Sequence, residues 1–223
     1  MAELPFLFDP RGYEFQNMVD VLRKSAEAGM AALSNEIRTL ERQLEEYRQN
    51  DEFDGERDED GHVLWDRDEL LSHEISLAQE ALIELRKAFA IAAYHHWERS
   101  VQLWIAQKHK VDMATGISVR KTKPARGYEQ LSNAAQEIGF PTNAEFQRVV
   151  TLANTLKHNS ETYGAKLLEL WPDIFPSRFS KPSNVSDWVS AIHLNDGHLT
   201  EIFRIVSKSG PIAFPAWKPR NDD

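Results

Sequence analysis

Residues 66–108 read DRDELLSHEISLAQEALIELRKAFAIAAYHHWERSVQLWIAQK, without a proline or a glycine. Apolar side chains recur along this stretch at steps of three and four, which places them on one face of an α-helix. At a rise of about 1.5 Å per residue, the helix would be ~65 Å long. Because such a helix is not stable alone in water, we expect other helices to pack along it. The apolar positions are Leu71, Ile75, Ala78, Leu82, Leu85, Phe89, Ala92, Trp97, Val101, Trp104 and Ile105.

Residues 13–49 show the same spacing and predict a second long helix. Charged residues occupy the positions between the apolar ones, a pattern typical of a coiled-coil seam. The connection between the two helices is short, so we expect them to form an antiparallel helical hairpin. The seam positions are Met30, Leu33, Ile37, Leu40, Leu44 and Tyr47.

The connection itself, residues 50–62 (NDEFDGERDEDGH), is strongly acidic and contains Gly55 and Gly61. Residues 51–69 hold ten Asp and Glu residues against two Arg residues. We interpret this stretch as a solvated tip. A calcium-binding loop is the alternative, although the segment lacks the Asp/Asn alternation and the closing Glu of an EF-hand.

Shorter helices are predicted over residues 128–138, 142–158, 161–171 and 196–209. The second of these starts with Thr142 or Asn143 in the N-cap position and has an apolar face. Residues 185–192 fit either a short strand or an extended piece, and the remaining segments read as irregular. We therefore predict an all-α protein in which a long antiparallel helical hairpin carries shorter helices. The length of 223 residues fits a single domain.

The composition excludes several classes of function. The chain has no cysteine, which excludes disulfides and thiol chemistry and suits a reducing cytoplasm. No apolar run approaches the ~20 residues of a membrane span, and the first residues lack the pattern of a secretory signal. We expect a cytoplasmic protein without a membrane partner. A net charge of −9 argues against a protein that coats nucleic acid with its whole surface, but a local basic site remains open.

Residues 108–126 supply such a basic segment. They hold six Lys and Arg residues against one acid, Asp112, and Gly116 and Pro124 predict a loop. One interpretation is a mobile, solvated loop. The other is a segment that contacts the phosphates of RNA. The candidate RNA-binding residues are Lys108, Lys110, Arg120, Lys121, Lys123 and Arg126.

The residues that could perform chemistry lie in two short clusters, one around His95 and one around His158. RNA cleavage needs proton transfer to and from the reacting oxygens and a cation that neutralises the phosphate. His158 could transfer the proton, and Lys157, Arg148 and Arg99 are suitable cations. The alternative is that His158 and Asn159 only cap the end of a helix.

Metal binding is a third interpretation of these clusters. His95 and Glu98 are three residues apart on one helix face and could share an ion, with His158 as a ligand from another helix. A helical histidine more often only satisfies hydrogen bonds. We therefore predict no metal and no cofactor.

The segment Ala153-Asn154-Thr155-Leu156-Lys157-His158, in an all-helical chain with a long helix pair, resembles the HEPN superfamily over residues 66–175. The hallmark of that family is an Arg, often followed by Asn or Asp, with a His after four to six intervening residues. Asn154 and His158 match the hallmark, whereas Ala153 replaces the Arg. Arg148 lies too far from His158 for the family spacing, and Arg99 could substitute for the Arg from the neighbouring helix.

The resemblance implies a HEPN-like bundle and a metal-independent ribonuclease of bacterial antiphage defence or toxin–antitoxin systems. It also implies a homodimer in which two histidines face each other. On this reading His158 is the acid or base, Lys157 with Arg148 or Arg99 stabilises the phosphate, and Asn154 orients it. The alternative, which the missing Arg favours, is a non-catalytic interaction protein or accessory subunit that binds a partner through its long helices.

Overall fold

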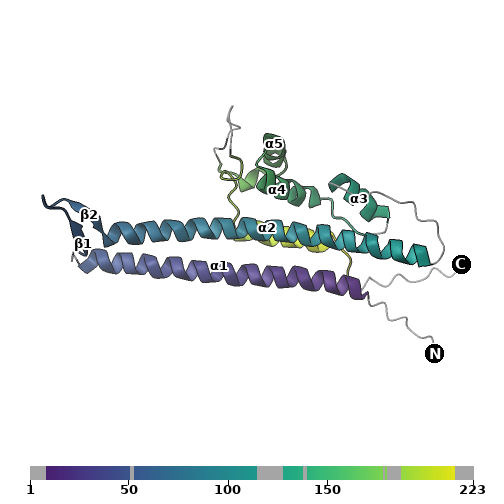
Figure 1. Cartoon of the computed structure of the whole chain (residues 1–223), viewed down its shortest axis with the longest axis horizontal. Coiled ribbons are helices and arrows are strands. Elements are labelled where there is room, and N and C mark those ends of the chain that lie inside the picture. The colour runs from purple at the N-terminus through teal and green to yellow at the C-terminus, as the bar shows by residue number, and fades with distance from the viewer. Residues whose placement is uncertain are drawn as a thin grey trace. The chain divides into compact units, whose positions relative to one another are not determined.

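The computed structural model describes residues 9–50, 53–114, 128–137, 140–177, 179 and 187–213, with the side chains of 108–114 excepted. Helices dominate these residues (Figure 1). The predicted all-α class, with two long helices and several shorter ones, is therefore confirmed. The helices are α1 (Pro10–Asn50), α2 (Arg67–Ala114), α3 (Tyr128–Glu137), α4 (Phe146–His158), α5 (Glu161–Leu170), η1 (Pro172–Ile174, a 3₁₀ turn) and α6 (Asp196–Lys208).

The chain divides into two compact units. One comprises residues 24–88, and the other comprises residues 1–23 together with 89–223. Both long helices contribute to both units, because each unit boundary falls within α1 or α2.

In the unit of residues 24–88, the end of α1 and the start of α2 lie side by side and run antiparallel (Figure 1). The seam predicted from the three–four spacing faces inward, with Met30, Leu40 and Leu71 buried. The other seam residues are half-buried, as expected where two helices share one narrow interface. Arg48 closes the far end of the pair by donating two hydrogen bonds to Asp68, at 2.5 and 2.9 Å.

The acidic connection is not the plain loop that we predicted. It forms a two-stranded antiparallel sheet from β1 (Gly55–Arg57) and β2 (Val63–Asp66). The β-forming run of Val, Leu and Trp explains β2, and Gly61, with φ +87°, provides the left-handed residue of the turn. Asp58 stabilises this turn, because its Oδ1 accepts hydrogen bonds from the backbone amides of Asp60 and His62.

Other boundaries also differ from the prediction. Helix α4 begins at Phe146 with Glu145 as its N-cap, and not with Thr142 or Asn143. Helix α2 continues to Ala114, six residues past the end predicted at Lys108, because no glycine or proline occurs before Gly116. Of residues 185–192, those from 188 to 191 form a turn instead of a strand. Asp187 favours that turn by accepting a hydrogen bond from the Ser190 amide at 3.1 Å.

The core of the other unit surrounds Trp97 of α2, which is fully buried. Its indole ring lies 4.4 Å from the Phe146 ring of α4 and 6.3 Å from that of Phe140, centroid to centroid. Ile202 and Val206 of α6 are also fully buried. This packing holds α4 in place, and α4 contributes more residues to the candidate site than any other helix.

His96 of α2 is a half-buried titratable group of this unit. Its ring stacks on Phe15 at 4.8 Å, and its Nε2 donates a hydrogen bond to the Phe15 carbonyl oxygen at 3.1 Å. Burial lowers the pKa of His96, and the positive charge of Arg99 lowers it further, whereas the hydrogen bond to Phe15 opposes the shift. The folded protein therefore holds this imidazole neutral.

The lowered pKa predicts acid sensitivity. The unfolded chain takes up a proton at His96 as the pH falls through about 6.5, whereas the folded chain resists doing so until a lower pH. The free energy of unfolding should therefore decrease on acidification from about pH 7.5 to pH 5. In His96→Gln, which keeps a donor without a titrating ring, urea denaturation should show a smaller decrease over the same range. An equal decrease in both proteins would show that His96 is not responsible.

Candidate functional site

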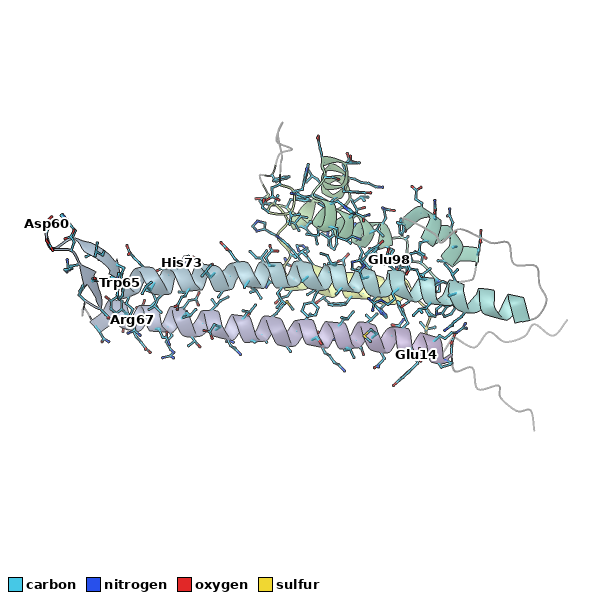
Figure 2. All side chains as sticks on the ribbon, viewed as in Figure 1. Glu14, Asp60, Trp65, Arg67, His73 and Glu98 are labelled. Carbon is cyan, nitrogen blue, oxygen red and sulfur yellow. The ribbon has the colours of Figure 1, made fainter. Side chains whose placement is uncertain are left out.

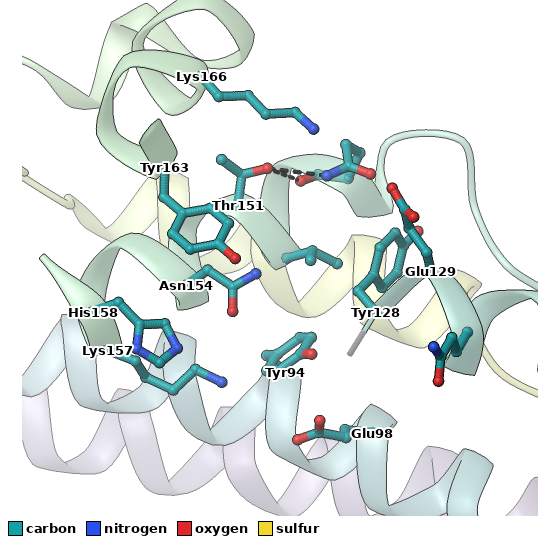
Figure 3. A pocket seen from close by; sticks show the side chains of 13 residues that line it. Tyr94, Glu98, Tyr128, Glu129, Thr151, Asn154, Lys157, His158, Tyr163 and Lys166 are labelled. Atoms are coloured by element: carbon teal, nitrogen blue, oxygen red, sulfur yellow. Dashed lines mark hydrogen bonds between the residues drawn. The ribbon is translucent and has the colours of Figure 1, made fainter. Parts of the chain in front are cut away.

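A polar cavity of about 480 Å³ lies in the unit of residues 1–23 and 89–223 (Figure 3). Four helices contribute side chains to it. Polar residues recur along one face of α4 at steps of three and four, which turns that face towards the cavity. The lining residues are Tyr94 and Glu98 from α2; Tyr128, Glu129 and Gln130 from α3; Gln147, Val150, Thr151, Asn154, Lys157 and His158 from α4; and Tyr163 and Lys166 from α5.

Three basic side chains line the cavity: Lys157 and His158 at the end of α4, and Lys166 of α5. Figure 3 shows Lys166, Tyr163 and His158 along one side of it, with Glu129 on the other. The His158 and Tyr163 rings lie 6.0 Å apart. The Lys157 ammonium lies 4.8 Å from the centre of the Tyr94 ring, a cation–π contact. Both lysines and His158 are exposed, so a ligand could reach them from solvent.

The floor of the cavity contains a hydrogen-bonded carboxylate. Glu98 lies 3.0 Å from His95 Nδ1 through its Oε2, and it also bonds the Tyr94 hydroxyl. Burial and the negative charge of Glu98 raise the pKa of Tyr94 far above its ordinary value. The hydroxyl therefore stays protonated and acts as a donor. On the α4 wall, the Thr151 hydroxyl donates to the Gln147 carbonyl oxygen at 2.8 Å, which fixes its direction.

The structure brings some predicted site residues together and leaves others outside. Asn154, Lys157 and His158 all line the cavity, whereas Arg99 and Arg148 do not. Arg148 ion-pairs with Glu201 of α6 at 3.4 Å and with Glu145 at 3.9 Å.

Arg148 belongs to a network between the start of α4 and α6. Arg204 completes this network with a 2.7 Å contact to Glu145, and it holds the pKa of Glu145 below its ordinary value. Arg148 is therefore placed for helix packing and not for chemistry in the cavity.

The alternative metal site is not assembled in the described residues either. Among the described residues, the one group of three His, Asp or Glu side chains whose ligand atoms lie within 4.8 Å of one another is Asp58, Asp60 and His62. His95, Glu98 and His158 do not form such a group. The predicted RNA-binding segment lies largely outside the described residues. Lys108 and Lys110 belong to the last turns of α2, but their side chains are not described. The other four, Arg120, Lys121, Lys123 and Arg126, lie within residues 115–127, outside the described part of the chain.

Asn159 is the C-cap of α4, directly after its last residue, His158. It adopts the left-handed conformation (φ 45°, ψ 42°), and its amide donates to the Thr155 carbonyl oxygen at 2.8 Å. Its side-chain oxygen accepts hydrogen bonds from the backbone amides of Trp188 and Val189, at 2.8 and 3.3 Å. The cap fixes the backbone at His158, whose side chain lines the cavity.

Asn159→Ala should lower the free energy of unfolding by about 2 kcal/mol, because it introduces left-handed strain and leaves the Trp188 amide without its side-chain acceptor. The Val189 amide keeps a second acceptor in Asp187, at 3.1 Å. Asn159→Gly should cost less, since glycine adopts this conformation freely and loses the acceptor alone. Urea denaturation of both variants separates the two effects. Equal and small losses would show that neither the backbone conformation nor the side-chain hydrogen bonds matter here.

Sequence reasoning missed Tyr128, Glu129, Thr151 and Lys166. The polar spacing on α4 could have indicated Thr151, but α3 and α5 contribute through tertiary packing that no local pattern reveals. No family model matches this chain, and comparisons with curated proteins and with solved structures find no match. The HEPN resemblance therefore stays a prediction. None of the described helices has the combination of length and apolar character needed to cross a bilayer.

Proposed function

We propose that the chain acts on RNA as a metal-independent ribonuclease, in the setting of bacterial antiphage defence or a toxin–antitoxin pair. The observation that carries the proposal is the cavity that unites His158, Lys157, Asn154 and Lys166. A space of about 480 Å³ has room for a nucleotide unit. Two lysines suit its phosphate, and amide and hydroxyl groups suit its sugar and base.

The proposed reaction is attack of a ribose 2′-oxygen on the adjacent phosphorus. Glu98 takes the proton of the 2′-hydroxyl, and the bond from phosphorus to the 5′-oxygen breaks. His158, as the general acid, gives a proton to that leaving oxygen. Lys157 and Lys166 neutralise the phosphate while charge builds up on it, in the role that an arginine has in the HEPN hallmark. The products are a 2′,3′-cyclic phosphate and a 5′-hydroxyl end.

Expression of the wild-type chain in bacteria tests this proposal. We expect growth arrest with degraded total RNA for the wild type, and healthy cells with intact RNA for His158→Ala. His73→Ala is the matched control, because His73 is also an exposed helical histidine but lies in the other unit. Intact RNA in cells that contain folded wild-type protein, or degradation that persists in His158→Ala, would contradict the catalytic assignment.

A second candidate function is a non-catalytic accessory subunit that binds RNA or a partner protein. It is favoured by the composition of the cavity, whose described lining contains no arginine. On this proposal the purified chain would bind single-stranded RNA without cleaving it, and Lys157→Ala with Lys166→Ala would abolish binding. Elution with a second protein, and no nuclease activity of the chain alone, would favour this candidate over the first.

A further inference from the structure

The hairpin of β1 and β2 exposes several large apolar side chains, among them Trp65 (Figure 2). The three consecutive residues Val63, Leu64 and Trp65 are 44%, 59% and 38% exposed, and Phe53 beside them is 45% exposed. Single exposed apolar residues are common, but a contiguous group of large ones marks an interaction site. We call Phe53 together with β2 (Val63–Asp66) the hairpin surface.

The backbone of the hairpin is open to a further strand. The sheet has two strands in the described chain, so each strand has one edge without a strand partner. Glu56 of β1 pairs with Trp65 of β2, and the next residue, Arg57, pairs with Val63. Leu64 therefore has no residue opposite it and forms a β-bulge. Its side chain faces solvent. A two-stranded ribbon of this length gains little stability alone, and its free edges can accept an extended peptide.

The charge around the hairpin surface indicates what kind of peptide fits. Glu56, Glu59 and Asp60 are exposed acids on β1 and the turn. The two local arginines are already engaged: Arg57 lies 4.2 Å from the centre of the Phe53 ring, and Arg67 contacts Asp54 at 3.1 Å. A second copy of the same hairpin would bring acids against acids, which disfavours self-pairing.

We propose that the hairpin surface docks a basic, extended segment of a partner protein, which adds to β2 as a third strand. Main-chain hydrogen bonds to the open edge would align the segment, and its apolar side chains would cover Leu64 and Trp65. Its lysines or arginines would face Glu56, Glu59 and Asp60. This inference is independent of the cavity and of the proposed nuclease function, because all of its residues lie in the unit of residues 24–88.

A random-sequence peptide library, selected on the full-length protein, tests the proposal. We expect the enriched peptides to be positively charged with alternating apolar residues. The strongest of them, made synthetically and measured by calorimetry, should bind Leu64→Thr and Leu64→Lys at least ~10-fold more weakly than the wild type. Glu59→Lys combined with Asp60→Lys should also weaken binding, and high salt should do the same.

Leu103→Lys is the matched control, because Leu103 is 57% exposed on α2 in the other unit and should leave binding unchanged. All of these positions are exposed, so circular dichroism should show folded variants. The proposal would be overturned if no peptides were enriched on the wild type relative to Leu64→Thr, or if the enriched peptides were acidic. It would also be overturned if Leu103→Lys weakened peptide binding as much as the Leu64 variants do. Self-association of the wild type that Leu64→Thr abolishes would also overturn it, because the occupant would then be a second copy.

Discussion

RNA cleavage by the purified chain should fall at least ~10²-fold in His158→Asn, the loss typical of removing a general acid or base. Asparagine keeps a polar side chain of similar size but cannot transfer a proton. His158 is exposed at the end of α4, and Asn159 holds that end in place independently, so the substitution should leave the fold intact. A loss of activity with an unchanged melting temperature would therefore report chemistry.

The two lysines proposed to bind the phosphate provide the matched comparison. Lys157→Gln and Lys166→Gln should each reduce cleavage, and the double variant should reduce it most, because both cations line the same cavity. Arg148→Gln should have little effect on cleavage, since Arg148 pairs with Glu201 outside the cavity. If Arg148→Gln or Arg99→Gln abolished cleavage while the lysine variants retained it, the assignment of the cavity would be wrong.

Gly164→Ala should lower the free energy of unfolding by ~3 kcal/mol, at the upper end of the usual cost of overpacking. A Cβ at this position of α5 would lie 2.0 Å from Cδ2 of the Trp188 indole. Trp188 is fully buried, its ring packs against Phe175 and Phe179, and Asn159 holds its backbone amide. The indole therefore has no room to move, and the clash outweighs the ~1 kcal/mol that alanine gains in a helix.

Gly29→Ala is the control for this prediction. Gly29 is also helical, but the nearest atom to an added Cβ is the end of the flexible Leu85 side chain, at 3.2 Å. The change should be neutral or stabilising by up to ~1 kcal/mol, as measured by urea denaturation. Because Gly164 lies between Tyr163 and Lys166, its substitution should also reduce cleavage. Equal effects at the two glycines would contradict the packing described around Trp188.

The sequence alone predicts the helices well, because each has a periodic apolar face that determines where it packs. The end of α4 at His158 and the seam through Met30 and Leu40 follow directly from this spacing. The hairpin was missed because Val63, Leu64 and Trp65 form a run too short to stand out beside so many acids. The end of α2 was missed because the loop predicted from Gly116 and Pro124 was extended back to Lys108, whereas the helix continues to Ala114.

The candidate site was predictable only along α4, where Asn154, Lys157 and His158 lie within one turn of each other. The contribution of Lys166 and Tyr128 depends on how α5 and α3 pack on α4, which no local pattern reports. Arg148 illustrates the limit most clearly. It has the right chemistry and lies on the right helix, but it is one position beyond Gln147, and there it pairs with α6 instead of lining the cavity.

Incubation of the purified chain with a single-stranded RNA in the presence of EDTA, with the product ends identified by mass spectrometry, tests the central claim most directly. We predict cleavage without metal, fragments that end in 2′,3′-cyclic phosphate and 5′-hydroxyl groups, and loss of these fragments in His158→Asn. Intact RNA with the folded wild-type chain, or the same fragments from His158→Asn, would contradict it.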